Sequence, residues 1–223
     1  MGTSVSMRSS RTSRPWAMAR ASISTGASPE TVLTDVIRAA AGDWLSMLTS
    51  DGVTVYAQYA ADAWAQVAEK PTEDDRRAEV SSVLRDARTR ALSAGGAGVA
   101  VGLAERALAR TLLGRLQDDA DAAGRGQQPH TLPPPNLIPG LLGELMRQTA
   151  MHFYTRDAAA YTGTAAIPDV QTFNTTTRRI GEAAANAARA GRPALSGRGT
   201  DGWTAAVRAA MQSAARPNAN PGM

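Results

Sequence analysis

Apolar residues recur at intervals of three and four positions through most of the chain, and no stretch shows a convincing two-residue alternation. The first spacing places side chains on one face of an α-helix, whereas alternation is typical of a half-buried strand. The first clear helical stretch follows Ser28-Pro29-Glu30, which combines a capping hydroxyl, a proline at the first helical position and an early acid. The sequence therefore predicts an all-α fold, with about seven helices in one helical domain.

Glycine and proline interrupt this spacing and predict where the helices end. The interruptions lie at Asp51-Gly52, Lys70-Pro71, Gly95–Gly98, the stretch 124–137, Pro168 and Gly191. A sixth helix is accordingly expected from about Thr175 to Ala190, and a short seventh helix from about Thr200. The expected parts are a basic extended arm (1–28), an N-terminal helical part (29–123), a Pro/Gly linker (124–137), a C-terminal helical part (138–190) and a basic C-terminal tail with a short helix (191–223).

Several kinds of chemistry are excluded by what the chain lacks. It contains no cysteine and only two histidines, His130 and His152. Disulfides, thiolate metal sites and thiol nucleophiles are therefore ruled out, and a multi-histidine metal site is not expected. No apolar run reaches the roughly 18 residues that a membrane span needs. We expect a soluble protein without a metal, another cofactor or membrane contact.

Alanine is abundant in the fourth and sixth predicted helices, and the chain has only two phenylalanines. An alanine face lets helices approach closely but buries little area, at roughly 25 cal/mol per Å². This composition predicts a thin core, and subunit association is one way to supply the missing burial.

The positive charge comes almost entirely from arginine and is unevenly spread. Lys70 is the only lysine among 24 basic residues. Residues 1–29 hold four arginines and no acid, residues 30–125 hold 15 acids against 11 bases, and residues 126–223 hold 9 bases against 5 acids. Guanidinium groups bind phosphate oxygens in pairs and stack on bases, which indicates nucleic acid as a partner. A GC-rich coding sequence would also enrich arginine.

The first 28 residues are rich in Ser, Thr and Arg and poor in large apolar side chains. Arg8, Arg11 and Arg14 suit the neutralisation of nucleic-acid phosphates. The same composition fits an organelle transit peptide, and Met1–Ser6 fits the myristoylation pattern. A disordered leader without a role is the remaining interpretation.

A second group of hydroxyls and arginines stands where the sixth helix is expected to begin, in Thr175-Thr176-Thr177-Arg178-Arg179. Free backbone N–H groups at a helix start point toward an anion, so this segment predicts a phosphate site. An ordinary helix cap with two exposed arginines is an equally good interpretation.

Other polar motifs have simpler interpretations than catalysis. Asp118-Asp119-Ala120-Asp121 offers magnesium ligands or a dock for a neighbour's arginine arm, but a solvated acidic turn is favoured. Glu144 and His152 share a helix face two turns apart, without a third group that would complete a catalytic site. We expect His152 to be a half-buried packing residue and His130 to be solvated. No catalytic residue is predicted, and the chain is not expected to be an enzyme.

The segment Met146-Arg147-Gln148-Thr149-Ala150-Met151-His152-Phe153, with Ala160-Tyr161 downstream, resembles a helix in the coat proteins of flexuous filamentous plant viruses. In place of that family's later Phe-Asp pattern this chain has Arg178-Arg179-Ile180. The resemblance implies an all-α fold, terminal arms that link neighbouring subunits, and a basic groove for a single-stranded RNA genome. It implies that Arg147 contacts RNA or supports the structure.

We therefore predict a structural, self-assembling protein that packages single-stranded nucleic acid, with RNA as the expected form, in a homo-oligomer or filament. Its expected location is a virion or the host cytoplasm, or alternatively a bacterial cytoplasm. A helical scaffold or phage-type structural protein without nucleic-acid contact is the alternative, and an enzyme using Glu144, His152 or Asp118 is less favoured. The predicted nucleic-acid-binding residues are Arg8, Arg11, Arg14, Arg147, Arg178, Arg179, Arg189 and Arg192.

Overall fold

The structure is a computed structural model that describes residues 14–96, 98–126, 136–190 and 200–216. Over these residues the chain is all-α, as predicted, and an isolated bridge between Thr162 and Ile167 is the only strand-like pairing. The helices are α1 (Arg14–Ser24), α2 (Pro29–Leu48), α3 (Asp51–Ala68), α4 (Glu73–Ser93), α5 (Gly98–Gly124), α6 (Leu137–Ala158), the 3-10 turn η2 (Ala159–Tyr161), α7 (Val170–Ala190) and α8 (Thr200–Ala214).

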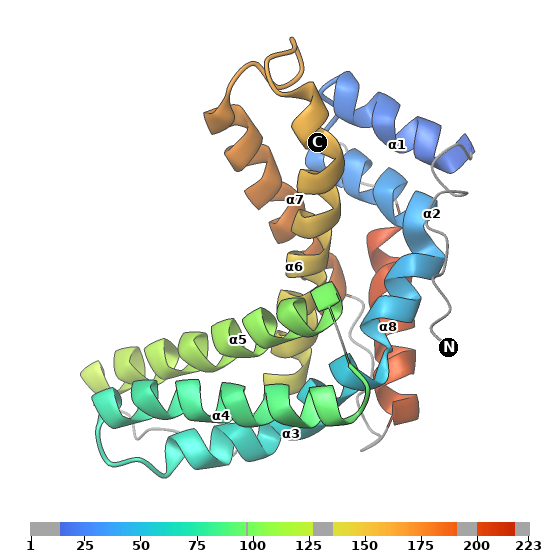
Figure 1. The fold of residues 1–223 in the computed structure, drawn as a ribbon. Coiled ribbons are helices and arrows are strands. Elements are labelled where there is room, and N and C mark those ends of the chain that lie inside the picture. The colour runs from blue at the N-terminus through green and yellow to red at the C-terminus, as the bar shows by residue number, and fades with distance from the viewer. Residues whose placement is uncertain (1–13, 97, 127–135, 191–199, 217–223) are drawn as a thin grey trace.

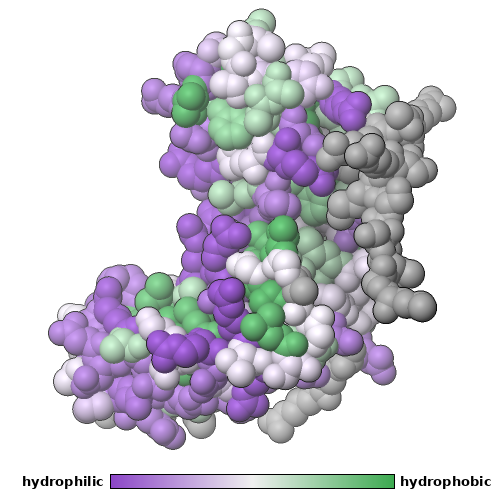
Figure 2. All heavy atoms as spheres, viewed as in Figure 1, coloured by the Kyte–Doolittle hydropathy of each residue, from purple (hydrophilic) through white to green (hydrophobic). Residues whose placement is uncertain are grey.

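The helices form two groups that α6 connects (Figure 1). One group is the layer of α3, α4 and α5, which extends to one side at the lower end of the view. The other group contains α1, α2, α7 and α8 around the rest of α6, with α7 folded back along α6 as a hairpin. In the space-filling view, hydrophilic residues cover most of the outer end of the α3–α5 layer (Figure 2). None of the described helices is both long and apolar enough to cross a membrane.

Two predicted helix starts are confirmed by their capping hydrogen bonds. The Ser28 hydroxyl accepts from the backbone N–H of Thr31 at 3.3 Å, and the Thr72 hydroxyl accepts from that of Asp75 at 3.1 Å. Each bond satisfies an N–H group that has no partner within the helix. These local signals correctly predict where α2 and α4 begin.

The arm differs from the prediction in its second half. An extended segment was expected through residue 28, but residues 14–24 form α1, with Ala19 and Ile23 buried in the core. The Ser22 hydroxyl also donates to the Asp35 carboxylate on α2. A segment with few large apolar residues can form a helix when a partner helix provides the surface that covers it. Arg14 begins α1, whereas Arg8 and Arg11 lie outside the described residues.

The predicted start of the sixth helix is wrong, because α7 begins at Val170. Asp169 provides the cap, and its carboxylate accepts from the backbone N–H of Thr172 at 2.6 Å. That hydrogen bond lowers the pKa of Asp169. Thr175–Arg179 therefore lies within the helix, where its backbone N–H groups face carbonyls, and the Thr177 hydroxyl donates to the carbonyl of Phe173 at 2.8 Å. An acidic cap also occupies the helix start, so the predicted phosphate site there is wrong.

The expectation of a thin core is wrong as well. One contiguous apolar cluster runs through all the α-helices, and it contains the buried side chains of Trp44, Trp64 and Trp203. Trp44 on α2 stacks on Phe153 of α6 with ring centroids 5.5 Å apart, and the Trp203 indole donates to the carbonyl of Leu48 at 2.8 Å. The alanines allow the helices to approach these large side chains closely. The core therefore gives no reason for the fold to depend on subunit association.

Candidate functional site

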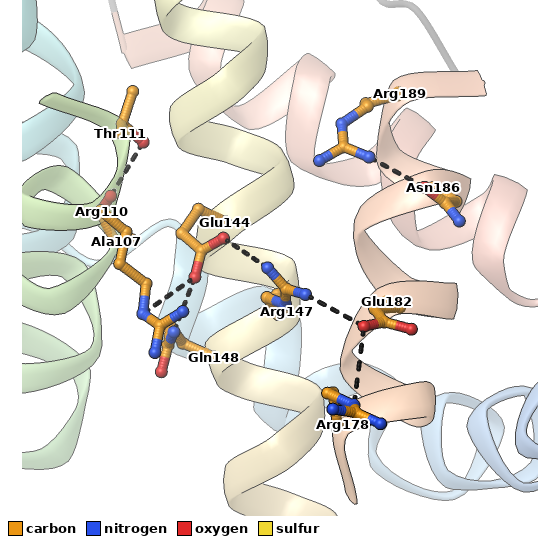
Figure 3. A network of polar contacts seen from close by, with 10 residues as sticks. All are labelled: Ala107, Arg110, Thr111, Glu144, Arg147, Gln148, Arg178, Glu182, Asn186 and Arg189. Carbon is orange, nitrogen blue, oxygen red and sulfur yellow. Dashed lines mark hydrogen bonds and ion pairs between the residues drawn. The ribbon is translucent and has the colours of Figure 1, made fainter. Parts of the chain in front are cut away.

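Arginines from three helices gather on one surface of the molecule (Figure 3). We call this surface the arginine face and define it by Arg110 on α5, by Glu144, Arg147 and Gln148 on α6, and by Arg178, Glu182, Asn186 and Arg189 on α7. Four guanidinium groups stand against two carboxylates, so the face carries a net positive charge. The helix hairpin of α6 and α7 brings together residues up to 45 positions apart.

Glu144 joins α5 to α6 at the base of this face. Its carboxylate lies 3.6 Å from Nε of Arg110 and 3.4 Å from Nη1 of Arg147. The Gln148 side-chain amide donates to it at 2.7 Å. The Glu144 side chain is only 11% exposed. Because a largely buried carboxylate is costly without partners, these contacts fix the carboxylate in place.

Glu182 joins α6 to α7 more loosely. Its Oε1 atom lies 3.6 Å from Nη2 of Arg147 and 4.0 Å from Nε of Arg178. Its side chain is 48% exposed. An exposed pair at these distances contributes little stability, because water screens both charges. Arg147 thus contacts one firmly held and one loosely held carboxylate.

Arg147 and Arg189 each pass close to a glycine of the neighbouring helix. A Cβ atom at Gly181 on α7 would lie 3.0 Å from Cγ of Arg147 on α6. A Cβ atom at Gly143 on α6 would lie 3.8 Å from Nε of Arg189 on α7. The close approach of Arg147 therefore depends on the absence of a side chain at Gly181, whereas Gly143 has room for a Cβ atom beside Arg189. Nη1 of Arg189 also donates to Oδ1 of Asn186 at 2.8 Å.

His152 continues the line of Glu144 and Gln148 along α6. It is half-buried, as predicted, and packs edge-on against Phe153 with ring centroids 5.7 Å apart. Burial lowers the pKa of His152 below 6.5, and the guanidinium groups of Arg156 and Arg106 lower it further, against an opposing effect of Asp157. The neutral imidazole is therefore favoured in the folded protein.

Acidification is expected to destabilise the protein through His152. Below the pKa of 6.5 in the unfolded chain, the unfolded state binds more protons at this site than the folded state does. The free energy of unfolding should therefore fall as the pH is lowered from 7 toward 5, and His152→Gln should make that fall smaller. Urea denaturation at several pH values measures how steeply the free energy of unfolding changes with pH in the wild type and in the variant. Equal slopes for the wild type and the variant would contradict this assignment.

The structure brings together Arg147, Arg178 and Arg189 of the predicted nucleic-acid-binding residues. Arg179 is exposed on α7 but makes no contact within the arginine face, and Arg192 lies outside the described residues. Sequence reasoning missed Arg110 and Glu182, and it considered Glu144 only as a candidate catalytic residue. Arg110 repeats Arg106 one turn later on the same helix, and that spacing is the only signal in the sequence that could have indicated it.

The acidic motif at the end of α5 does not form a metal site. Within the described parts of the chain, no three His, Asp or Glu side chains are grouped as metal ligands. Asp118 pairs with Arg115 at 3.0 Å, and Asp121 accepts from Gln117 at 3.0 Å. These two side chains are exposed, as a solvated turn requires, but Asp119 is buried, which the sequence did not indicate.

A cavity of about 220 Å³ lies on the other side of α7, between α2 and α8. Small side chains of α7 leave this space, among them Ala183, Ala187 and Ala190. Asn186 borders the cavity as well as the arginine face, so its hydrogen bond to Arg189 links the two.

The fold and the site define an all-α protein with an arginine-rich surface built across a helix hairpin. Comparisons of the chain with protein-family models, with curated proteins and with solved structures found no match. The resemblance of Met146–Phe153 to plant-virus coat proteins therefore stays a prediction.

Proposed function

We propose that this protein binds single-stranded nucleic acid by its phosphates at the arginine face, in a structural and non-catalytic role. The observation that carries the proposal is the convergence of Arg110, Arg147, Arg178 and Arg189 from three helices. Guanidinium forks match phosphate oxygens in geometry as well as in charge. Packed helices hold the backbones of these residues in fixed relative positions.

The face is suited to phosphates more than to bases. None of its eight residues is aromatic, so it offers no ring for a base to stack on. Binding should therefore tolerate any base sequence and weaken steeply with salt. On single strands the logarithm of the affinity falls with the logarithm of salt concentration by about 0.7 per phosphate contact.

Packaging requires many copies along one strand, and this part of the proposal extends beyond the arginine face. Arg8, Arg11 and Arg192 would add phosphate contacts or link neighbouring copies. RNA, a filament and a virion are the forms that the resemblance of the α6 segment implies.

Replacing three exposed arginines of the face should abolish most of the binding. The variant Arg110→Gln/Arg178→Gln/Arg189→Gln keeps Arg147 and Gln148, so Glu144 retains two partners. The loss of three phosphate contacts should reduce the slope of log affinity against log salt concentration by about 2. Near 0.1 M salt the affinity itself should fall by about 100-fold. Fluorescence anisotropy with a labelled 20-residue oligouridine in a salt series measures both.

A matched control removes three arginines from elsewhere. Arg20→Gln/Arg85→Gln/Arg208→Gln lowers the net charge equally, through exposed positions on α1, α4 and α8 that do not belong to the face. Its affinity should fall by less than about tenfold, because only long-range attraction is lost. Equal losses in the two variants would show that net charge, and not the arginine face, determines binding.

A helical scaffold without nucleic-acid contact is the second candidate, and the buried position of Glu144 favours it. A carboxylate that is 11% exposed and contacts Arg110 and Arg147 joins α5 to α6 whether or not a ligand binds. If oligouridine does not bind at 20 mM salt while light scattering shows a defined oligomer, the scaffold function is correct. A monomer that binds the oligonucleotide without further assembly would support binding and contradict packaging.

A further inference from the structure

We infer that Arg147 and Arg178 form a phosphate-binding subsite, and that the carboxylate of Glu182 occupies it in the free protein. This inference rests on the proposed function, because it names the group on the nucleic acid that the arginine face receives. It also assigns a separate role to each of the two glutamates on that face.

The contacts of Glu182 show an anion held between two cations. A single oxygen, Oε1, faces Nη2 of Arg147 at 3.6 Å and Nε of Arg178 at 4.0 Å (Figure 3). Both distances exceed those of a good charge-assisted hydrogen bond, which lie near 2.7–2.9 Å. A phosphodiester has two charged oxygens and is not tied to α7, so it can approach both guanidinium groups more closely than Glu182 does.

Arg147 is the fixed half of this subsite. Its stem crosses Gly181, where a side chain would meet it at 3.0 Å, and its Nη1 donates to Glu144 at 3.4 Å. The Arg147 side chain is 24% exposed and presents Nη2 toward Glu182 on α7. Arg178 is the adjustable half, because its side chain is 68% exposed. Because Arg147 is already held in place, only Arg178 has to be ordered when a phosphate of a flexible nucleic-acid strand binds. The cost in side-chain entropy is therefore small.

The two glutamates differ in whether a phosphate can replace them. Glu144 is 11% exposed and accepts a hydrogen bond from Gln148 at 2.7 Å, so removing it from its partners would strand a buried charge. Glu182 is 48% exposed, and among the described residues its ion pairs are the two long ones, so its carboxylate can turn into water when a phosphate arrives. Glu144 therefore positions Arg147, and Glu182 competes with the ligand.

The variant Glu182→Gln tests the competition directly. It removes the competing charge while keeping the size of the side chain, and it should bind inorganic phosphate about 5- to 10-fold more tightly than the wild type. The affinity for oligouridine should rise by a similar factor at low salt. Titrations followed by phosphorus NMR for phosphate, and by anisotropy for the oligonucleotide, measure these changes. The thermal unfolding midpoint should stay close to that of the wild type.

Two further variants separate this effect from a general loss of negative charge. Glu73→Gln removes an exposed carboxylate that pairs with one arginine, Arg77, at 2.6 Å on α4, and it should leave phosphate binding unchanged. Glu182→Gln/Arg178→Gln should lose the gain, because one half of the subsite is missing. An equal gain from Glu73→Gln, or no gain from Glu182→Gln, would overturn the subsite.

The outcomes also distinguish the subsite from the proposed function. If Glu182→Gln tightens phosphate binding but neither protein binds oligouridine, the subsite is supported and the nucleic-acid function is wrong. If oligouridine binding depends on Arg110, Arg178 and Arg189 but does not respond to Glu182→Gln, the function is supported and the subsite is wrong.

Discussion

Trp44→Ala is expected to lower the free energy of unfolding by about 4 kcal/mol, within the range for large aromatic side chains removed from a core. The Trp44 side chain is completely buried on α2 and stacks on Phe153 of α6 at 5.5 Å. It belongs to the core cluster that runs through all the α-helices. Removing it leaves a cavity between α2 and α6, and the cost of such a cavity adds to the lost burial.

Urea denaturation followed by circular dichroism at 222 nm measures this loss, and Trp44→Phe provides the matched control. The indole N–H of Trp44 has no hydrogen-bond partner in the described structure. Phenylalanine keeps most of the ring and removes that unpaired donor, so the cost should stay below about 1.5 kcal/mol. If alanine costs no more than phenylalanine does, the packing between α2 and α6 has been assigned wrongly.

Gly52→Ala is expected to cost about 3 kcal/mol, at the upper end for overpacked sites. Gly52 lies in the first turn of α3, where a Cβ atom would come within 2.5 Å of Cα of Gly96 and 3.2 Å of Cγ2 of Val101. Because the nearest atom is backbone, no side-chain rotation can relieve the clash. The start of α3 would have to separate from the turn between α4 and α5.

Gly114→Ala is the control for this substitution. Gly114 lies within α5, and a Cβ atom there would meet nothing within 4 Å. Alanine should stabilise the helix at this position by up to about 1 kcal/mol, because it restricts the unfolded chain more than glycine does. The two variants therefore shift the urea midpoint in opposite directions if the contact between Gly52 and Gly96 is correct. A midpoint for Gly52→Ala equal to or above that of the wild type would contradict that contact.

Most of the helices could be predicted from the sequence because their signals are local. Ser28 and Thr72 cap their helices through residues three positions away, and the apolar spacing that follows each cap needs no distant partner. The start of α7 was missed because a β-branched and polar stretch followed Pro168, and Asp169 was not recognised as its cap. The helix α1 was missed because Ala19 and Ile23 are too few to predict a core face without the helix they pack against.

The candidate site could be predicted only in part. The charge pattern indicated a phosphate-binding role for arginines near the end of the chain, and Arg178 and Arg189 belong to the arginine face. The pattern did not indicate that Arg147 also pairs with Glu182, because that contact crosses from α6 to α7. Arg110 was missed for the same reason, since its partner lies 34 positions away on another helix.

The sequence by itself determined that the chain is helical, where most helices begin and end, and that its cations are almost all guanidinium groups. These properties depend on residue type and on neighbours within one or two helical turns. The tertiary structure decided which arginines share a surface, which glutamate is buried among them and which glutamate is exposed enough for a phosphate to replace it. Those outcomes depend on how α5, α6 and α7 cross, and side-chain volume limits that crossing at close approaches such as Gly181.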